Sequence, residues 1–266
     1  MPEQQELIAD VKDGIGRLTL NRPERRNALS PDLLVKIHLQ LEAWAKTDVV
    51  RVAVFAGSGG KAFSSGYDIT AIPTEVTEEL KQVLKKYNPL ELALSGVRNF
   101  PYPTIAMLNG YAFGAGLNLA VCCDVRVAAD DVKAGMPPAR LGLVYHPEGL
   151  RQFVEVLGMP RTREVFLSGK TYQGPELLHM GLADHLVPWS RLEETVATLA
   201  GVMAQNAPLS LRGTKRILNM LGSCIQLGPQ DLAEAEAWIT EAFNSEDLKE
   251  GQTAFLEKRP PRFTGR

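Results

Sequence analysis

Two glycine-containing turns contain the residues of this chain that could act together in catalysis. The first, FSSGYD at residues 63–68, follows an expected strand, and the second, GYAFGAG at residues 110–116, precedes an apolar run. If these turns lie side by side, one backbone N–H from each can point at a single oxygen atom. That arrangement is an oxyanion hole, and the positive end of a helix behind the second turn strengthens it. Spacing alone favours the alternative, in which the glycines serve only tight turns and close helix packing.

The elements that must position these turns alternate between strand and helix. Residues 7–20 predict a hairpin around Asp13-Gly14, and Ser30-Pro31-Asp32 predicts the start of an amphipathic helix. Further strands are expected at 49–56, 104–109 and 125–129, with a buried helix at 117–123. The polar stretch 73–100 predicts a helix or a mobile lid that shapes a pocket.

Beyond residue 190 the pattern becomes helical. Helices are expected at 192–204, 209–221, 230–243 and 245–258. We therefore predict an α/β core over residues 1–200 and a C-terminal helical oligomerisation region over residues 201–266. A helix pair folded back on its own core is an equally good interpretation of this tail.

Composition excludes several classes of function. The 266 residues are 45% hydrophobic and 23% charged, with a net charge of −2, so neither nucleic acid nor a membrane is expected as a partner. Cys122, Cys123 and Cys224 fit neither a disulfide framework nor a zinc site, and no other cluster predicts a metal. No basic and apolar leader and no membrane-spanning run is present, which predicts a cytoplasmic protein.

Three ordered motifs give the chain a family resemblance. NRPERRNAL at 21–29, KAFSSGYDI at 61–69 and NGYAFGAG at 109–116 resemble the signature stretches of the enoyl-CoA hydratase/isomerase (crotonase) superfamily, and the similarity continues through GLAD at 181–184. The resemblance implies a crotonase (ClpP-like) fold of stacked ββα units with a helical C-terminal region. It further implies an acyl-CoA substrate, a homotrimer or homohexamer, and no cofactor other than the coenzyme A that the substrate carries.

The same resemblance assigns the oxyanion donors. The backbone N–H groups of Tyr67 and Ala115 match the two that hold the thioester oxygen in the family, with Gly66 and Gly114 forming the turns. Negative charge builds on that oxygen as an enolate forms, and fixed donors stabilise the enolate more than the neutral thioester. Ala115 replaces a commoner glycine, but its main-chain donor remains.

Two departures from the family pattern bear on the reaction. Similar hydratases carry two glutamates, at positions held here by Asn118 and Pro138, and neither of these residues can take a proton. Addition of water needs both an acid and a base, so hydration by the usual pair is not expected. His146 and Glu148 are the nearest substitutes for the missing carboxylates.

LGLVYH at 141–146 and SEDLKEGQTAFLEKRP at 245–260 most resemble the methylmalonyl-CoA decarboxylase branch. Decarboxylation needs an electron sink and a desolvated carboxylate but no general base, which fits Asn118 and Pro138. The resemblance implies that Tyr145 hydrogen-bonds the departing carboxylate of the substrate. It leaves His146, Glu148 or water to deliver the proton that later quenches the enolate. This predicts a CoA-thioester decarboxylase, a lyase; the alternatives are an atypical enoyl-CoA hydratase or isomerase and a non-catalytic acyl-CoA-binding protein.

The coenzyme A contacts are also predicted from the matching motifs. Arg22, Arg25 and Arg26 form a cationic loop suited to phosphates, although a solvated basic turn is the simpler interpretation. Without the family, Tyr145 would be read as a core tyrosine and His146 as a surface histidine. The remaining predicted CoA and substrate contacts are Ala28, Lys61, Ala62, Ser64, Asp68 and Ile69, and, from the tail, Phe255 and Lys258.

Overall fold

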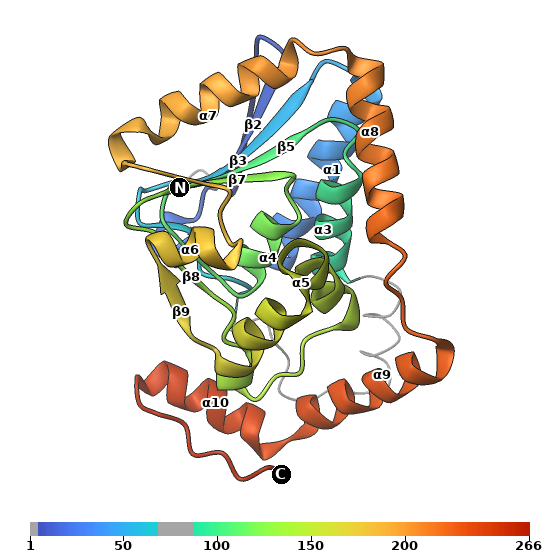
Figure 1. Ribbon diagram of the computed structural model, residues 1–266. Helices are drawn as coiled ribbons and strands as arrows, with labels where there is room; N and C mark the ends of the chain where they lie inside the picture. Colours follow the sequence, from blue (N-terminus) through green and yellow to red (C-terminus); the bar gives the residue numbers. More distant parts are fainter. Residues whose placement is uncertain (1–4, 69–87) are drawn as a thin grey trace.

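The computed structural model describes residues 5–68 and 88–266 (Figure 1). Its strands are β1 (Leu7–Lys12), β2 (Ile15–Leu20), β3 (Val52–Gly57), β4 (Ala62–Ser64), β5 (Thr104–Leu108), β6 (Tyr111–Phe113), β7 (Val125–Ala129), β8 (Lys133–Gly135), β9 (Thr171–Gln173) and β10 (His185–Val187). Its α-helices are α1 (Pro31–Thr47), α3 (Pro89–Asn99), α4 (Ala115–Val121), α5 (Pro147–Ser168), α6 (Pro175–Met180), α7 (Trp189–Ala204), α8 (Pro208–Gly222), α9 (Pro229–Asn244) and α10 (Glu246–Glu257). Two short 3-10 helices are η1 (Pro23–Arg25) and η3 (Pro138–Leu141).

The larger sheet has six strands in the order β1-β2-β3-β5-β7-β10. It begins with the predicted hairpin: Lys12 pairs with Ile15 across Asp13 and Gly14, whose φ values of 51° and 76° are those of a type I′ turn. From β2 onward the pairs are parallel. Parallel strands are covered on both faces, which explains why every residue of β3 is buried.

The smaller sheet has four strands in the order β4-β6-β8-β9. Its first two strands immediately precede the two glycine turns, because β4 ends at Ser64 and β6 ends at Phe113. They pair in parallel, so their carboxyl ends lie at the same edge of the sheet. Helix α4 starts at that edge, is buried along its whole length and contacts strands of both sheets. This pairing brings the two turns together.

Helices cover the larger sheet and extend the core. Helix α1 starts as predicted, with Pro31 at its first position and the Ser30 hydroxyl accepting from Leu33 N–H at 3.2 Å. Helix α7 packs across β2, β3, β5, β7 and β10 (Figure 1). The predicted boundary at residue 200 falls inside α7, so the chain continues past it without a break.

The C-terminal helices wrap the same chain. Helix α8 packs on α3, where Lys215 Nζ donates to Asp124 at 2.6 Å and to the Tyr102 carbonyl at 3.0 Å. Helices α9 and α10 lie at the end of the molecule opposite α7 (Figure 1), and α10 contacts η3 of its own chain. The fold-back interpretation of the tail is therefore realised for α10.

The predicted α/β core followed by helices is confirmed, with the last strand ending at Val187. The stretch predicted as a helix or lid, 73–100, lies partly outside the described residues; its remainder contains α3. None of the helices in residues 5–68 and 88–266 has the length and apolar character to cross a membrane.

Candidate active site

The first glycine turn is anchored by one bridge to Leu29. Leu29 N–H donates to the Gly66 carbonyl at 2.8 Å, and the Leu29 carbonyl accepts from Asp68 N–H at 3.0 Å. In such a parallel bridge, the residue between the two bonded ones turns its own N–H to the opposite side. The Tyr67 amide therefore points away from Leu29, and in the described part of the chain it meets no protein acceptor.

The second glycine turn ends at the N-terminus of α4. Gly114 is the N-cap of this helix, and its own N–H donates to the Gly135 carbonyl at 3.0 Å. Ala115 is the first helical residue, and the first N–H groups of a helix have no partner within the helix. Over residues 5–68 and 88–266, the Ala115 amide meets no acceptor either.

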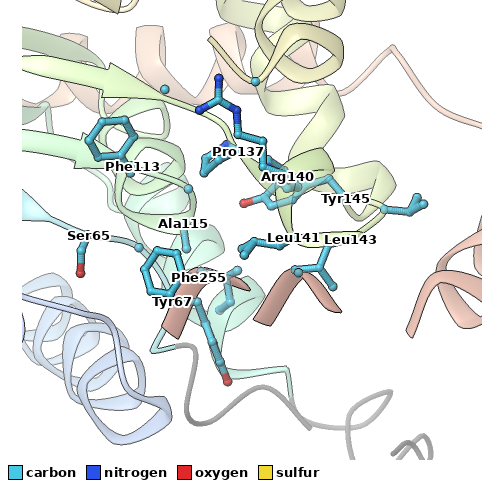
Figure 2. Close-up of a pocket in the computed structure, with 18 of the residues that line it drawn as sticks. Ser65, Tyr67, Phe113, Ala115, Pro137, Arg140, Leu141, Leu143, Tyr145 and Phe255 are labelled. Carbon is cyan, nitrogen blue, oxygen red and sulfur yellow. The ribbon is translucent and has the colours of Figure 1, made fainter. Parts of the chain in front are cut away.

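The two turns lie against one another. A Cβ atom on Gly66 would lie 2.8 Å from the Phe113 carbonyl oxygen and 3.5 Å from the Ala115 nitrogen. The φ of Gly66 is +105°, a conformation that only glycine adopts without strain. Figure 2 shows Tyr67 and Ala115 on the same side of a cavity. Each turn thus brings one amide without a protein acceptor to this place.

A cavity of about 1520 Å³ opens beside the turns. It is lined by residues of both turns, of η3, of the segment before α5, and of α9 and α10, so the helical tail of the same chain forms one wall. The Phe255 side chain lines the cavity from α10 (Figure 2). The predicted site residues that line the cavity are Arg26, Lys61, Gly66, Tyr67, Gly114, Ala115, Pro138, Tyr145, His146 and Phe255.

Other predicted site residues do not reach the cavity wall. Most of them are buried behind it or engaged elsewhere, and Lys258 is the left-handed C-cap of α10. Ile69 lies outside the described residues. The predicted residues that do not line the cavity are Arg22, Arg25, Ala28, Ala62, Ser64, Asp68, Asn118, Glu148 and Lys258.

Arg22 is bonded by two carboxylates and a carbonyl of the chain itself. Its guanidinium lies 3.1 Å from a Glu6 carboxylate oxygen and 3.2 Å from one of Asp68, and it donates to the Ala28 carbonyl at 2.7 Å. Only 15% of the side chain is exposed. The polar groups of Arg22, Ala28 and Asp68 thus bond to one another, and their assignment as coenzyme A contacts stays a prediction. Among the three predicted arginines, Arg26 lines the cavity.

Two buried asparagines that sequence reasoning missed hold the loops around the first turn. Asn27 is fully buried, and its Nδ2 donates to the carbonyls of Ala62 at 2.8 Å and Ser58 at 3.0 Å. The Asn109 side chain exchanges two hydrogen bonds with the backbone of Gly57, at 3.0 and 2.6 Å. Asn27 and Asn109 both lie inside the matching motifs, which is the signal by which the sequence could have indicated a structural role for them.

Asn118 lies behind Tyr145, which lines the cavity, and belongs to a row of hydrogen-bonded polar side chains. Its Oδ1 accepts from the Tyr145 hydroxyl at 2.7 Å, and its Nδ2 donates to Gln152 Oε1 at 2.7 Å. Gln152, which is 2% exposed, was not predicted; it also accepts from Cys122 at 3.2 Å and directs Nε2 toward Glu148 at 3.4 Å. Since a carboxylate only accepts, this order fixes both amides, and in this structure the Tyr145 proton goes to Asn118 Oδ1.

Glu148 is separated from the predicted catalytic cavity. It lines a second cavity of about 180 Å³, between α3, α5 and α8, and accepts from Arg151 at 2.9 Å. Burial alone would raise the pKa of Glu148, but the Arg151 hydrogen bond and charge lower it below its ordinary value. Glu148 is thus held as an ion-paired carboxylate that anchors Gln152, which disfavours it as a proton donor in the main cavity.

Tyr145 is fixed by packing as well as by its hydroxyl. Its ring lies 5.3 Å from that of Phe166, and burial raises the pKa of its hydroxyl, so the phenol stays neutral. A Cβ atom on Gly149 would overlap this ring, with Cδ1 only 2.8 Å away, and would lie 3.2 Å from Asn118 Oδ1. Gly149 is therefore the residue that permits Tyr145 to sit beside Asn118.

We predict that Gly149→Ala destabilises the protein by about 1–3 kcal/mol, the usual cost of overpacking a core. The Tyr145 ring must move, and the contact with Asn118 is lost with it. Urea denaturation, together with the tyrosine fluorescence of the native state, measures both effects. Gly213→Ala is a matched control in a helix, since its Cβ would meet nothing within 4 Å; equal stability of both variants with wild type would contradict the prediction.

His146 lies on the cavity wall beside a carboxylate that sequence reasoning missed. It is the N-cap of α5, and its Nδ1 lies 2.7 Å from Glu91 Oε1 in α3. Both residues line the cavity. Strands of both sheets separate them along the chain, so no local pattern marks the pair. Elsewhere in residues 5–68 and 88–266, no group of three or more His, Cys, Asp or Glu side chains could hold a metal ion.

The chain is similar to known proteins over nearly its whole length. Residues 10–266 match the family model described as enoyl-CoA hydratase/isomerase. The chain is 33% identical, over 98% of its length and 99% of the relative's, to the 2,3-dehydroadipyl-CoA hydratase of Escherichia coli (strain K12). Two solved structures cover at least 98% of both chains. A methylmalonyl-CoA decarboxylase in complex with 2-nitronate-propionyl-CoA aligns with a TM-score of 0.91 at 25% identity, covering 98% and 99%. An enoyl-CoA hydratase from Bacillus anthracis aligns with a TM-score of 0.74 at 28% identity, covering 98% and 100%.

Proposed function

The chain belongs to the enoyl-CoA hydratase/isomerase family of acyl-CoA enzymes, with the crotonase fold that its motifs predict, and from that premise we propose that it decarboxylates a malonyl-type CoA thioester. The observation that carries this proposal is the neutral side chain of Asn118 behind the cavity, hydrogen-bonded on both sides. A carboxylate there would repel the carboxylate of the substrate. An amide and the neutral phenol of Tyr145 do not.

In the proposed reaction, the amides of Tyr67 and Ala115 bind the thioester oxygen. As the bond to the carboxylate breaks, its electron pair moves into an enolate whose charge these amides stabilise. The start of α4 adds the positive end of its dipole at Ala115. Neither amide has another acceptor in the described ranges, so both are available to the substrate.

The remaining walls of the cavity would orient the substrate. Tyr145 and His146 lie on one wall, where they would face the leaving carboxylate, and Pro138 and Phe255 supply apolar surface that limits its hydration. Arg26 and Lys61, which belong to the first two matching motifs, also line the cavity and would take the phosphates of coenzyme A. We further propose the homotrimer or homohexamer that the family resemblance implies.

The alternative with specific support is an enoyl-CoA hydratase or isomerase of atypical design. The 33% identity to a 2,3-dehydroadipyl-CoA hydratase favours it, whereas the TM-score of 0.91 favours a decarboxylase. Such an enzyme would need a proton shuttle from His146, since Asn118 and Pro138 carry no acid. A non-catalytic acyl-CoA-binding protein would bind thioesters through the same cavity without turnover.

A substrate panel separates these functions. We expect CO₂ release from malonyl-CoA or methylmalonyl-CoA and no loss of enoyl absorbance with crotonyl-CoA. Tyr145→Phe should slow decarboxylation by roughly tenfold, the order expected for one hydrogen-bonding group, because the Tyr145 hydroxyl would turn its proton from Asn118 Oδ1 to the substrate carboxylate. Hydration of crotonyl-CoA without any CO₂ release would establish the alternative, and tight binding without turnover would establish a binding protein. An unchanged rate in Tyr145→Phe would remove Tyr145 from the mechanism.

A further inference from the structure

The N-terminal ends of two helices meet at the main cavity and bring an acid and an imidazole together. Asn88 caps α3, its Oδ1 accepting from Leu90 N–H at 3.1 Å and Glu91 N–H at 3.3 Å, which fixes Glu91 in the first turn. His146 immediately precedes α5, and its backbone carbonyl accepts from Leu150 N–H at 3.0 Å, which holds it at the start of this helix. The 2.7 Å contact between Glu91 Oε1 and His146 Nδ1 therefore joins two rigid elements.

This contact determines which ring nitrogen carries a proton. Among the described residues, the buried Glu91 Oε1 meets no aligned hydrogen-bond donor, although a buried carboxylate oxygen needs one, and the His146 imidazole 2.7 Å away is the group that can supply it. The Glu148 N–H also lies 3.4 Å from His146 Nδ1, and it could bond there only if Nδ1 had no proton. The contact to Glu91 is shorter and charge-assisted, so it prevails. Nδ1 then keeps its proton, and Nε2 is the nitrogen that can exchange one.

Charges from three helices favour the protonated imidazole. Glu91 in α3 makes the hydrogen bond that raises the pKa of His146 most; burial opposes it, and the charges of Glu91, of Glu148 in α5 and of Glu236 in α9 add to the rise. Protonated His146 can therefore act as an acid near neutral pH.

We propose that Glu91 is a positioning residue that holds His146 with its Nε2–H toward the cavity, from where it protonates the enolate. The assignment rests on the proposed decarboxylation. In that reaction, loss of CO₂ leaves the bonding electron pair in the enolate. The α-carbon then takes the Nε2 proton, the thioester carbonyl re-forms, and His146 is left neutral with Nδ1–H still on Glu91. Solvent returns a proton to Nε2.

The first test measures the titration of His146 directly and needs no substrate. The chain has four histidines, so the His146 signal is assigned in an NMR spectrum of labelled protein by its absence in His146→Gln. Glu91→Gln should lower the pKa of His146, whereas Glu236→Gln, which removes only a more distant charge, should lower it less. An unchanged titration in Glu91→Gln would overturn the positioning role.

The second test follows the proton itself. With methylmalonyl-CoA in D₂O, wild type should place deuterium on one face of the product α-carbon. His146→Gln should release CO₂ more slowly, because His146 also faces the leaving carboxylate, and the product that it forms should be deuterated at random on both faces. Glu91→Gln should keep the stereochemistry at low pH and lose it at a lower pH than wild type.

The outcomes also separate this inference from the proposed function. Stereospecific deuteration by His146→Gln would refute proton delivery by His146 while leaving decarboxylation intact. If wild type releases no CO₂ from any malonyl-type thioester, the proposed function fails and the delivery step fails with it. The NMR titration would then still decide whether Glu91 controls His146.

Discussion

Replacing Gly66 with alanine should lower kcat by about 10²–10³, the usual loss when one oxyanion donor is misplaced. The new Cβ would lie 2.8 Å from the Phe113 carbonyl oxygen, and neither backbone can move freely, because Gly66 is bonded to Leu29 and Phe113 ends β6. The φ of +105° adds strain for any L residue. The two turns must separate, and the Tyr67 and Ala115 amides then no longer meet one oxygen.

Gly60→Ala is the matched control for this experiment. Its φ of +66° imposes a left-handed cost of about 1–2 kcal/mol, but its Cβ would meet nothing within 4 Å. We expect this variant to lose stability in urea denaturation and to keep kcat close to wild type. A Gly66→Ala protein that is folded and retains kcat within about tenfold of wild type would show that this pair of turns does not form the oxyanion hole.

The parts of the fold that the sequence predicts are those set by neighbouring residues. The Asp13-Gly14 turn, the Ser30-Pro31 cap and the apolar run of β3 each depend on residues next to one another, and all three are observed. The two glycine turns could be located for the same reason. That they touch follows from the parallel pairing of β4 with β6, which no local pattern specifies.

The parts of the site that escaped prediction depend on contacts between distant segments. The ion pair of Arg22 with Asp68 joins residues 46 positions apart, so no local pattern shows it. Glu91 is an ordinary polar residue of a helix until α3 is packed beside His146. Gln152 could be suspected only as a polar residue on the buried side of α5. Side chains of this kind acquire their roles from tertiary packing, which also decides whether a charge is available to a ligand.

Asn118 is the position at which a single atom should change both stability and substrate choice. In Asn118→Asp, an oxygen replaces the Nδ2 that now donates to Gln152 Oε1 at 2.7 Å. Gln152 cannot simply turn over, because its Oε1 would then face the Glu148 carboxylate. The site is fully buried, so the new carboxylate has one strong donor, Tyr145, the weak thiol of Cys122 at 3.6 Å, and an opposing acceptor. Burial without a second strong donor raises the pKa of such a carboxyl above its unfolded value.

The sign of the pH dependence follows from that shift. Between the unfolded and the folded pKa of the new carboxyl, the native state binds more protons than the unfolded state, so stability falls as pH rises. We expect Asn118→Asp to be close to wild type in urea denaturation at acidic pH and less stable by about 1–3 kcal/mol or more above neutrality, as for a buried unsatisfied group. A stability difference that does not change with pH would contradict this expectation.

The same charge should discriminate between substrates. The ionised carboxylate introduced by Asn118→Asp would stand one side chain behind the carboxylate of methylmalonyl-CoA, and a like charge so placed should lower kcat/KM by about 10–100-fold above neutral pH. Propionyl-CoA, which has no free carboxylate, is the matched ligand and should bind as it does to wild type. Asn118→Leu removes the amide without adding a charge, so it should lose the Tyr145 contact yet bind both thioesters with little preference between them.

Equal weakening of the binding of methylmalonyl-CoA and propionyl-CoA by Asn118→Asp would mean that distortion of the site, and not repulsion of a carboxylate, limits the variant. The proposed decarboxylation would then lose the observation that carries it, because neutrality at this position would no longer matter to the substrate.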